Sequence, residues 1–568
     1  MHWAVWPAVL LAGVWSLAVV LVEPVLWHLV YDDAFYYFEI ARNVVAGHGL
    51  TFDRINPTNG FHVLWLLLCL PVYGLDPGPL AAVRVLLVLQ LALTGAACVL
   101  LSLCTGRAIL AEHRSAWSEQ AAAWGAIVLA CVFFSPVILK AYANGMESAV
   151  ALLLHAVVLY MLTGLRGKVA QSEAGGPTAE TGGRLATGLR AASSRVRWGL
   201  GGLLAMAFLA RSDAGLLVAV LGLWCAGRLI SRPKDLLWLL PVFAPPALAA
   251  GGFFALNLAW FGHPMQVSGE LKRATLSLAG LGLAGAVAGV VLLAVHGLPG
   301  RMAAALPATA ATLRGIGPYL VFSGLLVGYY SFLQGIAHWW YFGPPIACAA
   351  MLLAAALADL LLRARRESLA AQSAGKRSSS PLAVVFVVLV GIAGVSVWQG
   401  IEAASTASPA RTFAANRAAA EWMNEHLPEG SVVGCWDAGV TGYFCRHRVV
   451  NLDGVVNSFA YLAAMRDGRA GDLLNAQGVA YITNHTPIRP DGSHRLLDSL
   501  GQLVGPQRAG QAVEIHRVPF VFTGLTNRGR EGPNWAVLIL HLPSSPPRPM
   551  PPGEHGPPSH AEPPSLPR

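Results

Sequence analysis

The sequence predicts an α-helical polytopic membrane protein with a small α/β domain toward its carboxyl terminus. Only 12% of its 568 residues are charged and 55% are hydrophobic, whereas soluble globular proteins carry about 25% charged residues. The mean hydropathy is +0.54, and apolar runs such as 83–103 are too long and too numerous for a soluble core. From about residue 402 the pattern changes to short strands and helices. An ordinary soluble enzyme is therefore excluded.

Apolar runs of about 20 residues, the length that crosses a bilayer, predict about eleven transmembrane helices. They are expected at 4–30, 80–105, 119–139, 147–165, 198–211, 213–229, 236–259, 276–298, 315–337, 341–362 and 381–401. The two runs that flank Arg211-Ser-Asp213 are short, so we expect a helical hairpin whose polar tip reaches only partway toward the outer surface. Residues 61–75 are apolar but too few to cross, so we interpret them as a re-entrant or interfacial segment.

The basic residues lie between the predicted spans and predict how the chain is oriented. The net charge is +9, and Arg and Lys are concentrated at 107–114, 166–197, 228–234, 301–314 and 363–377. By the positive-inside rule, these loops and the amino terminus are cytoplasmic. An odd number of crossings then leaves the carboxyl-terminal domain outside the plasma (inner) membrane. Because the charge lies in loops between spans, nucleic-acid binding is not expected.

The domain boundaries follow from the same pattern. Residues 1–401 form the predicted membrane domain, with 31–79 as its first outer loop carrying interfacial helices. Residues 166–197 are rich in Gly, Ala, Ser and Arg, and 543–568 are Pro-rich, so both are expected to be disordered. Residues 402–542 form the extracytoplasmic α/β domain. Its pattern predicts a helix at 413–426 and strands near 431–436, 448–452, 479–484 and 535–542.

The α/β domain contains two of the eight cysteines, Cys435 and Cys445, on either side of a turn-rich segment. Two interpretations stay open: a disulfide, if the domain faces an oxidising side, or two buried thiols. The domain has no Gly-rich turn of the phosphate-cradling kind, which disfavours ATP or a nucleotide sugar as substrate. No metal site and no required cofactor are predicted, since no His or Cys spacing typical of zinc occurs. The carboxylates permit a divalent cation without requiring one.

The strongest candidate for chemistry is the polar segment after the first predicted span. Apolar residues recur there at helical spacing, at Phe35, Phe38, Ala41 and Val45, which predicts a surface helix with its aromatic face on lipid. Asp32 and Asp33 stand at its start. A helix N-cap needs only one carboxylate. Two adjacent carboxylates at the mouth of a membrane cavity favour a general base with a positioning partner.

Eight further polar or ionisable residues are expected on the outer side. They are His62, Glu147, Arg211, Asp213, Lys272, Arg273, His338 and Tyr341. The cations among them would stabilise a leaving phosphate near the carboxylates. Simpler interpretations also stay open: His62 snorkels at the interface, Glu147 suits a helix start, and Arg211 pairs with Asp213.

Several segments resemble the polytopic glycosyltransferases of the GT-C fold, which use polyprenyl-phosphate-linked sugars on the outer face of the membrane. YDDAFYYFEIARNVVAGHGLTF is similar to the first outer loop of their bacterial arabinofuranosyltransferase-like and protein-mannosyltransferase-like branches. The likeness covers about residues 25–485 and continues through NPTNGFHVLW, NGMES, ARSDAGLL, WFGHPMQVSGELK, HWWYFGP and CWDAGVTGYFCRHRVVNLDGVVN. After Gly49, NPTNGFH replaces the usual loop of the arabinosyl branch.

The resemblance implies that Asp32 or Asp33 deprotonates an acceptor hydroxyl and that a polyprenyl phosphate leaves with inversion at the sugar. It also implies that Glu147 and Arg211 lie near the cavity and that Lys272 contacts the phosphate. The expected partners are a polyprenyl-phosphate sugar donor, membrane lipid, and a glycan, lipid or protein acceptor in the cell envelope. The alternatives are a non-catalytic cell-envelope assembly protein and a secondary transporter or lipid flippase. No internal repeat typical of transporters is found.

Overall fold

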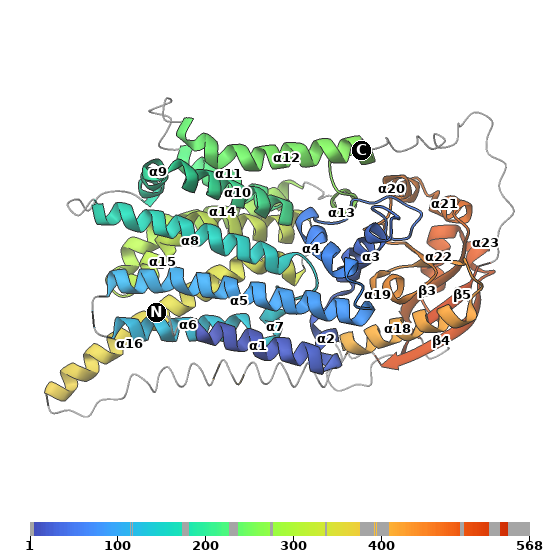
Figure 1. Cartoon of the computed structure of the whole chain (residues 1–568), viewed down its shortest axis with the longest axis horizontal. Helices are drawn as coiled ribbons and strands as arrows, with labels where there is room; N and C mark the ends of the chain where they lie inside the picture. The colour runs from blue at the N-terminus through green and yellow to red at the C-terminus, as the bar shows by residue number, and fades with distance from the viewer. Residues whose placement is uncertain are drawn as a thin grey trace.

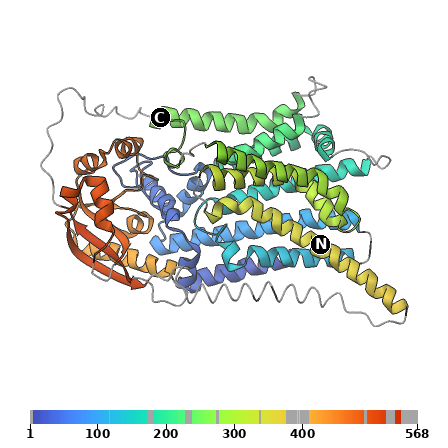
Figure 2. The ribbon, with the colours of Figure 1, turned by 180° about the vertical axis from the view of Figure 1, so that it is seen from behind.

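The protein is a polytopic helical membrane protein with a small α/β domain packed on one end of its helix bundle (Figure 1). The computed structural model describes residues 5–113, 115, 117–172, 181–226, 237–272, 277–334, 338–374, 391, 394, 408–488, 493–521 and 534–542. The long helices lie side by side. On the opposite side of the bundle, the long helix α16 extends beyond the end that faces away from the α/β domain (Figure 2).

The described part of the membrane domain consists of helices of very different lengths. They are α1 (Trp6–Leu21), α2 (Glu23–Leu29), α3 (Asp32–Val45), α4 (Val63–Gly74), α5 (Pro79–Glu112), α6 (Ser118–Phe133), α7 (Pro136–Leu139), α8 (Ser148–Ser172), α9 (Thr181–Ala191), α10 (Ser194–Ala210), α11 (Ala214–Ala226), α12 (Leu240–Phe261), α13 (Val267–Leu271), α14 (Leu278–Met302), α15 (Pro307–Gly328), the π-helical turn η3 (Tyr329–Leu333), the 3₁₀ turn η4 (Trp339–Phe342) and α16 (Gly343–Ser373).

Six of the described helices are long and apolar enough to cross a membrane. They are Pro79–Glu112, Ser148–Leu165, Leu237–Phe261, Leu278–Met302, Pro307–Leu333 and Trp339–Ser373. The predicted total of about eleven spans is therefore not confirmed, and the span expected at 381–401 lies outside the described residues. The short helices expected on either side of Arg211-Ser-Asp213 are present as α10 and α11. Helix α4 has 12 residues and is too short to cross, as predicted for 61–75.

The span predicted as continuous at 4–30 is in fact broken, because α1 and α2 are bent by 114°. The backbone leaves the helical region at Val22, whose φ is −120°. Pro24 then stands in the first turn of α2, where its missing N–H costs nothing. Helix α2 turns toward the α/β domain, and there Trp27 stacks on Phe413 with ring centroids 3.7 Å apart.

The 166–197 segment, expected to be disordered, is helical in its described parts. Helix α8 continues to Ser172, and α9 begins at Thr181. Leu185 and Leu189, one turn apart on α9, are 0% and 2% exposed because this face packs on the bundle. The Gly- and Ala-rich composition led to a prediction of disorder, although the spacing of Leu185 and Leu189 is typical of a short amphipathic helix. The Pro-rich tail at 543–568 lies outside the described residues.

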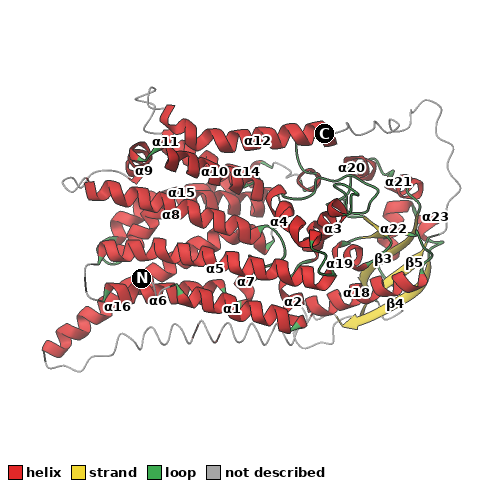
Figure 3. Ribbon diagram, in the orientation of Figure 1, coloured by secondary structure: helices red, strands yellow, loops and turns green. Residues whose placement is uncertain are grey.

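The α/β domain contains a five-stranded sheet in the order β2-β1-β3-β5-β4, and all strands of the described residues belong to it (Figure 3). Its elements are α18 (Ser408–His426), β1 (Val432–Cys435), α19 (Gly439–Phe444), β2 (Arg448–Asn451), α20 (Phe459–Arg466), α21 (Ala470–Ala476), β3 (Val479–Pro487), α22 (Leu496–Val504), α23 (Pro506–Ala509), β4 (Val513–Val521) and β5 (Asn534–His541). Strands β1, β2 and β3 are parallel, whereas β5 is antiparallel to both β3 and β4.

The predicted helix and the four predicted strands of this domain are confirmed, but β4 was not predicted. It carries an ion pair between Glu514 and Arg517 and a proline at 519. Such residues are tolerated there because β4 is an edge strand. Cys435 and Cys445 are both free and buried, at 1% and 2% exposure.

Helix α3 lies between the bundle and the α/β domain, which corrects the expected lipid-facing aromatic surface. Phe35 and Phe38 are 0% exposed. Phe35 contacts Phe413 of α18 and Tyr443 of α19, with ring centroids 5.3 Å apart in each case. Three of the four residues predicted to share an apolar face are buried, but Val45 is 47% exposed. The residues that cover Phe35 lie nearly 400 positions away in the sequence.

Candidate functional site

A cavity of about 640 Å³ lies where α3, the bundle and the α/β domain meet. Seven of the ten residues proposed from the sequence line it: Asp33, His62, Glu147, Arg211, Asp213, Lys272 and Tyr341. They come from α3, the loop before α4, the start of α8, the joint of α10 and α11, the end of α13, and η4. Val455 of the α/β domain also lines the cavity.

Asp32 does not line this cavity, although it is adjacent to Asp33. Its carboxylate accepts hydrogen bonds from the backbone N–H groups of Gly439 and Val440, at 2.9 and 2.8 Å. Both donors belong to the first turn of α19, where free N–H groups attract an anion. Burial raises the pKa of Asp32 well above its ordinary value, and the two backbone N–H groups act in the opposite direction. Asp32 therefore fastens the α/β domain to α3.

This contact is tight enough to predict the effect of one added methyl group. A Cβ on Gly439 would lie 2.0 Å from the backbone oxygen of Asp32. We expect Gly439→Ala to weaken the docking of the α/β domain by about 1–3 kcal/mol, the usual cost of overpacking. Gly251→Ala adds the same methyl group where no atom lies within 4 Å and should leave stability unchanged or slightly increased. Thermal unfolding and limited proteolysis of the two variants measure the difference, and equal resistance would contradict the prediction.

Asp33 lines the cavity and has a different environment. No described residue donates a hydrogen bond to its carboxylate. Burial raises its pKa; Lys272 lowers it, and the negative charges of Asp437 and Glu147 raise it further. A half-buried carboxylate with a raised pKa and an unused lone pair is suited to accept a proton from a bound hydroxyl.

Arg211 is the centre of an ion-pair network in the cavity lining. Its guanidinium contacts Glu147 Oε1 at 2.8 Å and Asp213 Oδ2 at 2.6 Å. The Tyr37 hydroxyl donates to Glu147 at 2.8 Å, and the Tyr330 hydroxyl donates to Asp213 at 2.8 Å. The pair between Arg211 and Asp213, the simpler interpretation of these residues, is thus present, but Glu147 joins it. One cation is offset by two carboxylates.

Lys272 and His62 complete the polar wall. Lys272 follows α13, and its backbone oxygen accepts a hydrogen bond from Gln334 Nε2 at 3.2 Å. No carboxylate of a described residue lies within ion-pair distance of its ammonium group. His62 Nε2 is 3.8 Å from Glu147 Oε1. Burial lowers the pKa of His62, which favours the neutral imidazole at neutral pH.

Of the last three sequence candidates, Tyr341 lines the cavity, whereas His338 and Arg273 are not placed in its lining. His338 stacks on Trp340 with ring centroids 4.3 Å apart and does not line the cavity. Tyr341, which does, stacks on Tyr330 at 4.1 Å. Arg273 lies outside the described residues. Among the residues described, no group of three or more His, Cys, Asp or Glu side chains is arranged to hold a metal ion.

Sequence reasoning missed two tyrosines that hold the network. Tyr37 lies four residues after Asp33 on α3, so helical spacing could have predicted that both face the cavity. Tyr330 belongs to a π-helical turn at the end of α15. No residue pattern in the sequence predicts this turn. Its contact with Arg211 and Asp213 could not be predicted either, because those two residues are more than 100 positions away in the chain.

Comparison with known proteins gives three results. Residues 405–537, most of the α/β domain, match a family model described as Domain of unknown function (DUF8728). No sequence among the curated proteins matches the chain. Solved structures similar to it include the archaeal oligosaccharyltransferase AglB from Archaeoglobus fulgidus in complex with an inhibitory peptide and a dolichol-phosphate, at 12% identity and a TM-score of 0.46, covering 87% of this chain and 74% of that chain.

A second similar structure is ArnT from Cupriavidus metallidurans bound to undecaprenyl phosphate. Identity is 15% and the TM-score is 0.46, with 94% of this chain and 97% of that chain covered. Both structures belong to the GT-C fold class that the sequence motifs resemble.

Proposed function

We propose that the protein is a membrane glycosyltransferase in which Asp33 deprotonates an acceptor hydroxyl that attacks a polyprenyl-phosphate sugar. The observation that carries this proposal is the cavity itself: the Asp33 carboxylate, with no hydrogen-bond donor among the described residues, shares it with Lys272 and Arg211. A base must be free to accept a proton, and a departing phosphate needs a fixed positive charge. The motifs around these residues resemble enzymes that carry out this reaction.

In the proposed step the acceptor proton moves to the Asp33 carboxylate. The acceptor oxygen bonds to the anomeric carbon while the bond between that carbon and the phosphate oxygen breaks, and the lipid phosphate leaves as an anion. Lys272 is the better candidate for the phosphate contact, because Arg211 is already held by Glu147 and Asp213. Arg211 then fixes the shape of the wall.

The lipid and the sidedness are part of the same proposal. The apolar residues of the cavity lining include Phe208, Leu216, Phe254 and Leu326, and such a surface suits the first isoprene units of the donor. The Arg-bearing helix α9 and the far end of α16 lie at the end of the bundle opposite the α/β domain (Figure 1). By the positive-inside rule, this arrangement supports a cavity and an α/β domain on the extracytoplasmic side.

The role of Lys272 predicts a binding defect. Lys272→Met keeps the length of the side chain and removes its charge, so we expect the dissociation constant for undecaprenyl phosphate to rise about tenfold, or about 1.4 kcal/mol, near the contribution of one hydrogen bond to a charged group. Lys140→Met is a matched control, because Lys140 lies over the Tyr31 ring and does not line the cavity. Titration of both purified variants with the lipid measures the difference. Equal affinities would remove Lys272 from the phosphate site.

The experiment that tests the function is a transfer assay with the purified protein in lipid vesicles. A panel of radiolabelled polyprenyl-phosphate sugars is supplied together with an extract of cell-envelope acceptors, and consumption of each donor is measured. Consumption of one donor that depends on Asp33 supports the proposal. No consumption by folded protein across the panel would overturn it, and movement of labelled lipid between leaflets would then favour a flippase.

A further inference from the structure

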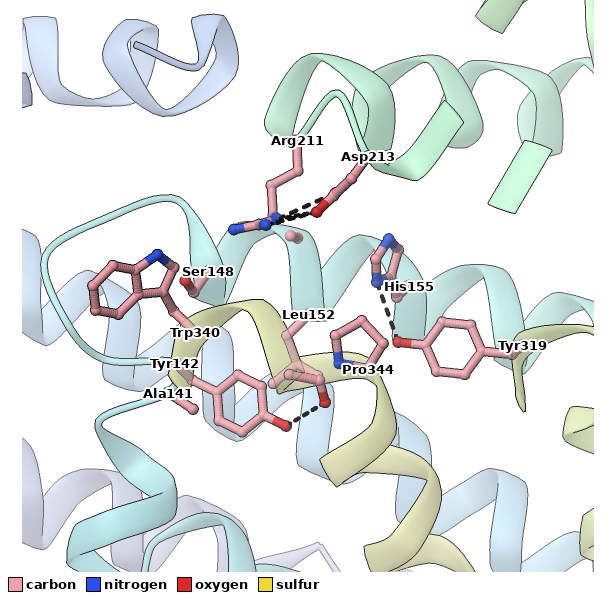
Figure 4. Close-up of a pocket in the computed structure, with 12 residues that line it drawn as sticks. Ala141, Tyr142, Ser148, Leu152, His155, Arg211, Asp213, Tyr319, Trp340 and Pro344 are labelled. Atoms are coloured by element: carbon pink, nitrogen blue, oxygen red, sulfur yellow. Dashed lines mark hydrogen bonds and ion pairs between the residues drawn. The ribbon is translucent and has the colours of Figure 1, made fainter. Parts of the chain in front are cut away.

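A second, much smaller cavity is also lined by Arg211 and Asp213. Its volume is about 20 Å³, and it shares Arg211, Asp213 and Trp340 with the large cavity. One face of α8 lines it, with residues at positions 148, 151, 152 and 155. The side chains that project toward it are drawn in Figure 4.

His155 is a polar residue of this lining that the proposed reaction does not use. It is 3% exposed, and the rings of Tyr319 and Phe322 lie 5.5 and 5.6 Å from its own. Its Nδ1 is 3.2 Å from the Tyr319 hydroxyl, whereas its Nε2 is buried with no hydrogen-bond partner. Figure 4 shows the imidazole between Tyr319 and Asp213, with one nitrogen bonded to the hydroxyl and the other on the Asp213 side.

A buried nitrogen without a partner costs free energy, so such groups in proteins are usually satisfied by an ordered water. A cavity can hold one ordered water when its volume exceeds about 10–15 Å³ and it offers two to four polar partners. The volume of about 20 Å³ meets the first condition. The His155 imidazole, the Asp213 carboxylate and the Ser148 hydroxyl meet the second, since all three line the cavity.

We propose that a single buried water molecule occupies this cavity and links His155 Nε2 to the Asp213 carboxylate. Tyr319 donates to Nδ1, so the imidazole carries its proton on Nε2 and donates to the water, which donates in turn to Asp213. His155 is then a positioning residue: it holds Asp213, and through Asp213 it holds Arg211 at the wall of the large cavity. The water site stands on the cavity alone, whereas the consequence for lipid-phosphate binding rests on the proposed function.

The water itself is tested by a structure of the wild-type protein in lipid nanodiscs at a resolution that shows ordered water. We expect one density peak within hydrogen-bond distance of His155 Nε2 and Asp213. An empty cavity in a map that shows other buried waters would overturn the proposal. Ala151→Val fills the cavity and leaves the His155 side chain unchanged, since Ala151 lines it and is 4% exposed, and the peak should then be lost.

The positioning role is tested by titration with undecaprenyl phosphate. His155→Leu and Ala151→Val should each weaken binding about tenfold, the size of one lost hydrogen bond to a charged group. His155→Gln, which can still donate to the water, should bind within about twofold of wild type. Loss of packing alone would not give near wild-type affinity in His155→Gln together with weakened binding in Ala151→Val.

The outcomes separate the two proposals. Wild-type affinity in both His155→Leu and Ala151→Val would overturn the positioning role and leave the glycosyltransferase proposal intact. No binding of the lipid by wild type would contradict the proposed function, while the density peak would still decide the water site. Loss of binding in His155→Gln as large as in His155→Leu would overturn the role of the water.

Discussion

Asp33→Asn is expected to lower the turnover rate of sugar transfer by about 10²- to 10⁴-fold, the usual contribution of a positioned general base. The amide keeps the size of the side chain but cannot take the acceptor proton. Stability should not change, because no described residue donates a hydrogen bond to Asp33. The measurement is the single-turnover rate at saturating donor, beside the thermal unfolding midpoint and the affinity for undecaprenyl phosphate.

Asp32→Asn is the matched control for this prediction, since it makes the same chemical change one residue away. An amide at position 32 can accept only one of the two N–H groups of α19, so we expect it to lower the unfolding midpoint. The predicted pattern is a lost rate with normal stability for Asp33→Asn and reduced stability for Asp32→Asn. The reverse pattern would assign the base to Asp32.

Because Asp33 is the proposed base, the rate of sugar transfer should depend on pH. Burial and the nearby charges of Asp437 and Glu147 raise its pKa, against the effect of Lys272. A general base is active when deprotonated, so transfer should fall as the pH drops through this raised pKa, at a higher pH than an ordinary aspartate would give. Lys272→Met removes the effect that lowers the pKa, so the acidic limb of kcat/KM should move to higher pH. An unchanged limb would place the two groups out of electrostatic range.

The candidate site shows which parts of this protein can be predicted from sequence. Local chemistry was sufficient to propose the pair Asp32 and Asp33 together with Glu147 and Arg211, because ionisable groups next to apolar spans are costly unless they serve a site. The regular pattern of the α/β domain likewise predicted four of its strands. Both signals lie within about 20 residues of chain and need no knowledge of what packs against them.

The division of roles between Asp32 and Asp33 could not be predicted in this way. Asp32 accepts hydrogen bonds from two N–H groups that are 407 and 408 positions away in the sequence. The residues near Asp32 give no indication of these partners. The same holds for Phe35, whose apolar character is compatible with lipid or with a protein partner and which in fact meets α18 and α19. The local sequence pattern predicts that a helix face is buried. Which residues cover that face depends on tertiary packing.

Arg211→Met is expected to be the most destabilising single substitution at the cavity, at about 3–5 kcal/mol. It leaves the Glu147 and Asp213 carboxylates without their shared cation, and their side chains are only 4% and 16% exposed. Buried charges without a partner cost more than the pair contributed, because each keeps its desolvation penalty. The free energy of unfolding in mild detergent, or the unfolding midpoint if the transition is irreversible, measures the loss.

Two further variants make this result specific to the ion pairs. Arg211→Met combined with Glu147→Gln and Asp213→Asn removes the stranded charges as well, so it should regain a large part of the stability. Lys272→Met removes a cation from the same cavity but breaks no described ion pair, and it should change stability by no more than about 0.5 kcal/mol. If Arg211→Met is as stable as wild type, the two carboxylates must take up protons or water in its absence. The wall would then be held by Tyr37 and Tyr330, not by the guanidinium.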